Sequence, residues 1–187
     1  RSFELSFLVW NLFLAGIPWV LSTMLVSMPK WPETRLTTFS VMAVWLLFFP
    51  NAPYILTDLI HLQRDLGMPL WFDLIVICSF AWTGLMFGLL SLLDVERALR
   101  RFVASWMVPL ISSALLFAAS FGIYLGRFLR WNSWNIANHP GGLAYDIAHR
   151  FAYPLDHPRT WGMTLLFGIM LNLMYWSFKL VAKRPGA

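Results

Sequence analysis

Five long runs of apolar residues dominate the sequence. They cover roughly Leu5–Met28, Leu36–Leu62, Pro69–Leu93, Phe102–Gly126 and Trp161–Val181. A helix needs about 20 mostly apolar residues to cross the hydrocarbon of a bilayer, and each run reaches that length. Hydrocarbon cannot hydrogen-bond a free backbone, and the runs are continuous where barrel strands would alternate. The pattern therefore predicts an all-α membrane protein, a five-helix transmembrane bundle forming a single domain over residues 1–187.

The second run is interrupted within the stretch FFPNAPYILTDLIHL, residues 48–62. A helix from Leu36 to Phe49 would extend about 21 Å, which is too short to cross about 30 Å of hydrocarbon. Pro50 and Pro53 therefore fall inside the membrane, where they should break or kink the helix. We expect the Asn51 side-chain oxygen to cap the helix that resumes after the break.

Polar residues recur at helical spacing after this break. Asn51, Tyr54, Asp58 and His61 are separated by three, four and three positions. A polar stripe on a membrane helix faces the bundle interior or a water-filled cavity. Asp58 and His61 are close enough along a helix to touch. This stripe is the first half of a predicted ligand-binding pocket.

The fourth run ends in a matching polar and aromatic face, formed by Ser113, Ser120, Tyr124, Arg127, Trp131 and Trp134. Asn11 in the first run and Asp73 in the third fall at the same predicted depth. Arg127 is the expected partner of Asp58 or Asp73, because an unpaired charge at that depth is costly. Asp73, Tyr124 and Arg127 therefore join the predicted pocket. Small residues at fourth positions, among them Gly84 and Gly88, should let helix backbones approach closely.

The long connector, residues 127–160, contains a short amphipathic pattern. Leu143, Ile147 and Phe151 recur at every fourth position, while Asp146, His149 and Arg150 fall on other faces. This pattern predicts a short helix that lies at the membrane interface and lids the pocket. Trp131, Trp134 and Trp161 are expected to anchor the chain at the same interface.

Composition and charge agree with a lipid environment. The chain is 59% hydrophobic and only 12% charged, which excludes an ordinary soluble domain. The net charge of +5 is spread over short connectors, so it indicates topology and not a nucleic-acid partner. Counting Lys and Arg near the helix ends gives eight on the C-terminal side and six on the other. This bias favours a cytoplasmic C-terminus with segment 127–160 outside.

The first residue and the single cysteine each support one further expectation. The first residue is not Met, so we expect residues to precede it, and we expect the first apolar run to be retained. The single cysteine, Cys78, excludes an internal disulfide and a multi-cysteine metal site. It lies inside the third run without a nearby base, so we interpret it as a packing residue.

The stretches FFPNAPYILTDLIHL and GRFLRWNSWNI together resemble the bacterial membrane proteins grouped as domain of unknown function 1361, over most of the chain. The resemblance implies a polytopic protein of the bacterial inner membrane without an assigned activity. It directs functional interest to Asn51, Pro53, Tyr54, Asp58, His61, Arg127, Arg130, Trp131, Asn132 and Trp134, which adds Arg130, Trp131, Asn132 and Trp134 to the predicted pocket. Asn135 stands where an acidic residue often follows, which weakens a role that needs a carboxylate there.

Several functions fit this pocket. The leading hypothesis is non-catalytic: binding of a lipid or a small anionic ligand, or service as an accessory subunit of a larger membrane complex or a homo-oligomer. An alternative is an enzyme that uses Asp58, His61 and Arg127 on a lipid-linked phosphate or sugar. A further alternative is a transporter component, since a broken span is a known device of substrate sites. We expect no metal ion, although Asp146 and His149 are weak candidate ligands, and only His61 could serve a haem.

Overall fold

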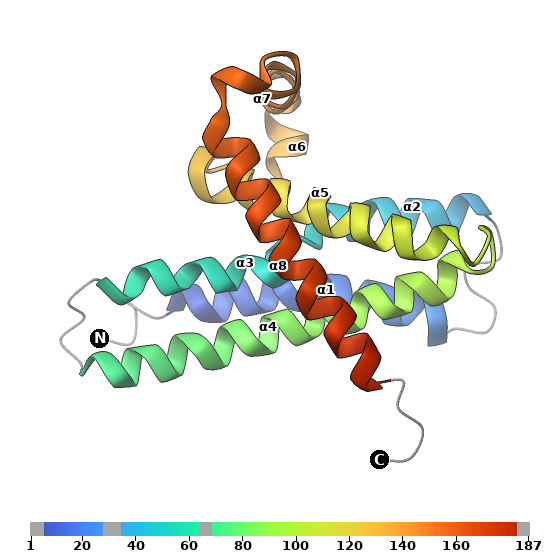
Figure 1. Ribbon diagram of the computed structural model, residues 1–187, viewed down its shortest axis with the longest axis horizontal. Helices are drawn as coiled ribbons and strands as arrows, with labels where there is room; N and C mark the ends of the chain where they lie inside the picture. Colours follow the sequence, from blue (N-terminus) through green and yellow to red (C-terminus); the bar gives the residue numbers. More distant parts are fainter. Residues whose placement is uncertain (1–5, 28–34, 64–68, 183–187) are drawn as a thin grey trace. The chain divides into compact units, whose positions relative to one another are not determined.

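The described part of the chain consists of helices and the short segments that join them. The computed structural model describes residues 6–27, 35–63 and 69–182, and within these ranges it contains no strand (Figure 1). Among the described residues, five helical stretches are long and apolar enough to cross a membrane. They are α1 (Ser6–Ser27), the stretch Arg35–Leu59, α4 (Leu70–Leu99), α5 (Met107–Leu129) and α8 (Pro158–Ala182). The prediction of an all-α protein with five membrane-spanning helices is confirmed.

One predicted connector is helical instead. The sequence DVERALRR was expected to link two spans, but α4 continues through Leu99. Ion pairs along the helix explain the extension. Arg97 Nη1 lies 2.8 Å from Asp94 Oδ1, and Arg100 Nη2 lies 3.8 Å from Glu96 Oε2. Pairs three or four residues apart stabilise a helix, so this charged end need not unwind at the edge of the apolar run.

The second span is broken where the prolines predicted. α2 (Arg35–Phe48) ends before Pro50, a four-residue helix α3 (Asn51–Tyr54) follows, and the 3-10 helix η1 (Ile55–Gln63) completes the segment. The Ala52 N–H bonds the Phe49 carbonyl at 3.1 Å, so the Phe48 carbonyl needs another donor. Asn51 Nδ2 supplies it at 2.9 Å.

This bond corrects the predicted role of Asn51. Pro50 occupies the cap position of α3 and no side chain caps the helix there. A proline deprives the preceding turn of a donor, and a carbonyl left free in hydrocarbon is costly. The Asn51 side-chain amide therefore donates to the last carbonyl of α2. The sequence had predicted that its oxygen would accept from the first N–H groups of α3.

The chain forms two compact units, residues 1–112 and 113–187. Helix α5 crosses the boundary between them, and the single membrane domain over residues 1–187 stays a prediction. In the first unit, α1, α4, α3 and η1 pack together (Figure 1). One buried apolar residue from each element forms the centre of this packing, namely Ala15, Ala52, Ile55 and Ala81.

Two glycines explain why the broken segment lies so close to α4. A β-carbon at Gly84 would sit 2.6 Å from Ile55 Cδ1 and 3.0 Å from the Ala52 carbonyl oxygen. A β-carbon at Gly88 would sit 3.1 Å from Ala52 Cβ. The predicted close approach at these glycines is confirmed, and it fixes η1 and its polar residues against α4.

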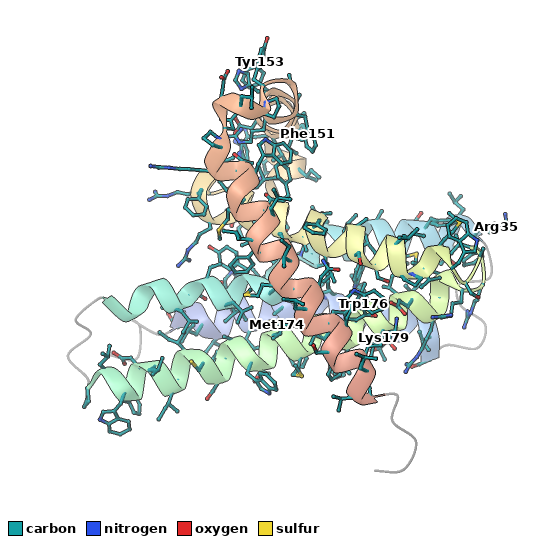
Figure 2. All side chains as sticks on the ribbon, viewed as in Figure 1. Arg35, Phe151, Tyr153, Met174, Trp176 and Lys179 are labelled. Carbon is teal, nitrogen blue, oxygen red and sulfur yellow. The ribbon has the colours of Figure 1, made fainter. Side chains whose placement is uncertain are left out.

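The second unit contains the rest of α5, then α6 (Asn135–Asn138), α7 (Pro140–Ala152), the turn η2 (Pro154–Asp156) and α8. Gly168 lets α8 cross α5, because a β-carbon there would collide with the Phe117 ring. Further along α8, Lys179 Nζ lies 4.6 Å from the centre of the Trp176 ring, and Figure 2 shows the two side chains on neighbouring turns.

Helix α7 confirms the predicted short helix in segment 127–160, but its faces are arranged unexpectedly. Tyr145 and Phe151 are exposed, together with three alanines of the same helix, whereas the charged Arg150 is buried. Figure 2 shows Phe151 and Tyr153 at the end of the unit that carries α7. The polar residues of α7 thus face the protein, and its contact with a membrane interface stays a prediction.

Candidate functional site

Asp58 is held by a hydrogen bond from another membrane helix. Its side chain is 1% exposed, and Asn11 Nδ2 on α1 donates to Asp58 Oδ2 at 2.9 Å. A carboxylate in this environment requires donors, because its charge cannot be solvated by lipid. The bond joins two residues that the sequence placed at a common depth.

The type of helix in η1 changes which residues share a face with Asp58. A 3-10 helix has about three residues per turn, so positions three apart lie above one another. The His61 side chain lies outside the described residues, so its predicted contact with Asp58 stays a prediction. Tyr54, four positions before Asp58, does not fall on the face of Asp58 and is half-buried. The continuous stripe predicted for an α-helix is thus divided by the change of helix type.

Asp73 is a second buried carboxylate in the first unit. It lies in the first turn of α4, where the helix dipole favours a negative charge. Its Oδ1 is buried and has no hydrogen-bond partner among the residues that the structure describes. A buried polar atom without a partner costs free energy, so this oxygen is a position where a bound donor would be stabilising.

Helix α5 ends in an unusual backbone conformation in the second unit. Arg130 has a φ angle of 61°, the left-handed conformation that helix ends usually assign to glycine. The next N–H, of Trp131, bonds the Leu125 carbonyl at 3.1 Å and closes the helix. A non-glycine residue in this conformation is strained by about 1 kcal/mol, so Arg130 lowers the stability of this helix end relative to glycine.

A cluster of side chains, the α5–α7 cluster, follows directly from this turn. It consists of Tyr124, Trp131, Asp146 and Arg150. Trp131 Nε1 donates to Asp146 Oδ2 at 2.8 Å, and Arg150 Nη1 lies 2.6 Å from the Asp146 carbonyl and 3.3 Å from its Oδ1. The Arg150 guanidinium also lies 6.0 Å from the centre of the Tyr124 ring. These contacts hold α7 against the end of α5.

Arg150 retains unused hydrogen-bonding capacity inside this cluster. The residue is 7% exposed, and its Nε has no partner among the described residues. A guanidinium has five N–H donors, and buried ones are normally satisfied. The α5–α7 cluster therefore offers a cationic donor that the described protein atoms do not fully occupy.

Asp146 and His149, the two weak candidates for metal ligands, bind different side chains. Asp146 accepts bonds from Trp131 and Arg150, while His149 Nδ1 lies 2.9 Å from His157 Nε2. This contact between two imidazoles ties α7 to the start of α8. Within residues 6–27, 35–63 and 69–182, no three His, Cys, Asp or Glu residues are grouped so that they could hold a metal ion.

Three further residues of the predicted pocket lie on either side of the turn at Arg130. Arg127 is half-buried in the last turn of α5, whereas Asn132 and Trp134 are exposed beyond it. Asp58 and Arg127 belong to different units, and their pairing stays a prediction. The pairing of Asp146 with Arg150 was not predicted, although their spacing of four residues on a predicted helix is a signal for it.

The comparison with known proteins agrees with both motifs. The family model described as "Protein of unknown function (DUF1361)" matches residues 10–174. No curated protein and no solved structure matches the chain. The matched region contains the broken second span, the end of α5 and the α5–α7 cluster. The chain therefore belongs to the family Protein of unknown function (DUF1361).

Proposed function

We propose that this polytopic membrane protein is a non-catalytic binding protein for an anionic group, carried by a lipid headgroup or by a small ligand. The site is the end of α5, with Arg130 as the primary contact and the α5–α7 cluster as its support. The observation that carries the proposal is the left-handed backbone at Arg130. Strained residues persist where the surrounding structure holds them, and they concentrate at binding and active sites.

The exposure of Arg130 supports a contact with a ligand. Its side chain is exposed, while the following Trp131 is fixed to α7 through Asp146. The guanidinium is therefore presented from a backbone that can move little. Arg is well suited to phosphate and carboxylate groups, because its planar donors can bind two oxygens at once.

The charge balance of segment 127–160 supports an anion. The segment contains four arginines and two aspartates. One of these aspartates, Asp146, is already paired with Arg150. The excess positive charge, with the unsatisfied Nε of Arg150, favours a negatively charged occupant at this end of the second unit.

The test removes the Arg130 charge without disturbing its backbone. Asn tolerates the left-handed conformation and Gly adopts it freely, so Arg130→Asn and Arg130→Gly should fold at least as stably as the wild type. Both should lose binding by about tenfold, the effect of removing a charge-assisted hydrogen bond. Binding is measured by native mass spectrometry of the protein released from nanodiscs that contain phosphatidylglycerol or phosphatidylcholine.

The control is Arg159→Gln, which removes an exposed arginine of the same segment and should leave retention of phosphatidylglycerol unchanged. Equal retention by the wild type and both Arg130 variants would refute the proposal. A membrane protein that co-purifies in fixed stoichiometry, with no retained anionic lipid, would instead favour the role of accessory subunit.

An enzyme is the second candidate, and Asp73 favours it. A buried carboxylate oxygen without a described partner, in the same unit as the paired Asp58, resembles the environment in which acids and bases acquire distinct roles. Turnover of a lipid-linked phosphate that is lost in Asp73→Asn, with stability unchanged, would support catalysis over binding.

A further inference from the structure

A groove of about 320 Å³ lies between α1 and α4, near the C-terminal ends of both helices. A ligand in this groove would be separate from the proposed anion site, because the groove is formed by the first unit and the anion site by the second. Its polar lining consists of Thr23, Ser27, Asp94 and Arg97, and its apolar lining includes Leu90 and Leu93. The groove thus combines a negative charge, a positive charge, hydroxyl groups and an aliphatic surface.

The two charges differ in how they face solvent. The Asp94 side chain is 14% exposed, whereas the Arg97 side chain is 63% exposed. Asp94 accepts a short bond from Arg97 and a longer one from Ser22 Oγ at 3.4 Å. Because a carboxylate can accept several hydrogen bonds, Asp94 retains acceptor capacity inside the groove.

The walls of the groove favour a cation beside Asp94. Trp19 lines the groove and stacks on Phe87, with ring centres 5.2 Å apart and planes inclined by 9°, so its ring is held in place. An indole face attracts cations. The groove also lies beside the last turn of α1, whose carbonyl groups carry a partial negative charge.

An anion is favoured beside Arg97. Its exposed guanidinium lies one turn beyond Asp94 on α4, and Arg100 and Arg101 follow at the same helix end. This clustering of arginines beyond an apolar helix is typical of the boundary between hydrocarbon and headgroups, where basic residues meet lipid phosphates. The aliphatic Leu90 and Leu93 line the part of the groove that lies toward the middle of α4.

From these features we infer that the groove binds a phospholipid whose phosphate carries a primary amine, as in phosphatidylethanolamine. The ammonium group donates to Asp94 and to the Thr23 and Ser27 hydroxyl groups, which line the groove. The phosphate accepts from Arg97, and an acyl chain follows the aliphatic wall. A primary ammonium has three donors, whereas a quaternary ammonium has none, so the groove should distinguish the two headgroups.

The experiment compares phosphatidylethanolamine with phosphatidylcholine in native mass spectrometry of the full chain from mixed nanodiscs. The wild type should retain the primary amine lipid about tenfold better. Asp94→Asn keeps the shape of the side chain and should abolish this preference. Arg97→Gln should weaken retention of both lipids by about threefold, because its guanidinium is largely exposed.

Two controls separate binding from folding. Ser22→Ala removes a bond to Asp94 without changing any charge, so it should preserve the preference. On the wild type alone, a series of mono-, di- and trimethylated headgroups should show stepwise loss of retention, which tests the inference even if Asp94→Asn does not fold. Equal retention of both lipids by the wild type, or an unchanged preference in Asp94→Asn, would overturn it.

The source of the headgroup is tested by competition. Soluble phosphoethanolamine, added at the same concentration as phosphatidylethanolamine, should not displace the bound lipid. It lacks the acyl chain that contacts Leu90 and Leu93. Complete displacement would identify a soluble ligand and overturn the assignment to a lipid. Arg130→Asn should leave this preference unchanged, so failure here and failure of the proposed anion site are distinguishable.

Discussion

Substitution of Gly84 by alanine tests the packing that positions the broken span. The added β-carbon would lie 2.6 Å from Ile55 Cδ1 and 3.0 Å from the Ala52 carbonyl oxygen. Ile55 is fully buried, so its methyl group has little room to rotate away. The Ala52 carbonyl belongs to the backbone, so it can move only if the helix segment moves with it. Overpacking of this kind costs about 1–3 kcal/mol. Replacement of a helical glycine returns about 1 kcal/mol, so we expect Gly84→Ala to destabilise the fold by about 1 kcal/mol.

The matched control is Gly16→Ala on α1. Its β-carbon would meet only Phe87 Cε2, at an ordinary contact distance of 4.0 Å. This variant should gain up to about 1 kcal/mol from helix propensity. The free energy of unfolding is measured by titrating sodium dodecyl sulfate into the purified protein in mild detergent micelles, with circular dichroism as the signal. If both variants shift the midpoint in the same direction, the proposed contact between the broken span and α4 is wrong.

Three further predictions concern other contacts. Gly168→Ala should lower the free energy of unfolding by about 1–3 kcal/mol in the same titration, because its β-carbon collides with a ring on α5, whereas Gly162→Ala, with open space around its β-carbon, should not. Trp131→Phe removes the indole donor to α7 and should cost about 1 kcal/mol, while Trp134→Phe at an exposed site should stay within about 0.5 kcal/mol. Asn11→Leu removes a donor from the buried Asp58 carboxylate and should lower the free energy of unfolding by about 1.5 kcal/mol, within the range measured for hydrogen bonds in membranes. An unchanged free energy of unfolding would show that this bond does not stabilise the fold.

The span pattern and the break could be predicted from the sequence, because both follow from strong local rules. Long apolar runs in lipid must be helical, and a proline inside one interrupts it. The end of α4 could not be placed in the same way, since ion pairs of Asp94 and Glu96 extend the helix past the apolar run. The donor role of Asn51 depended on which carbonyl lost its partner, which only the geometry of the break decides.

The candidate site was predicted less completely than the fold. The resemblance and the polar spacing directed attention to Arg130 and Trp131, but nothing local indicates that Arg130 adopts a left-handed backbone. Burial of Arg150 was also missed, because a charged residue on a connector between spans is usually solvated. Its partner is Asp146, and the stabilising contacts come from α5, which is distant in sequence. Tertiary contacts of this kind leave only weak signals in one sequence.

The central claim is that an anionic group binds at the end of α5. The most direct measurement is an experimental structure of the protein in nanodiscs that contain phosphatidylglycerol. The proposal predicts a lipid phosphate within hydrogen-bonding distance of the Arg130 guanidinium, and its disappearance in Arg130→Asn with the helix end unchanged. An Arg130 side chain that contacts only water, with ordered anionic lipid bound elsewhere on the protein, would contradict the proposal.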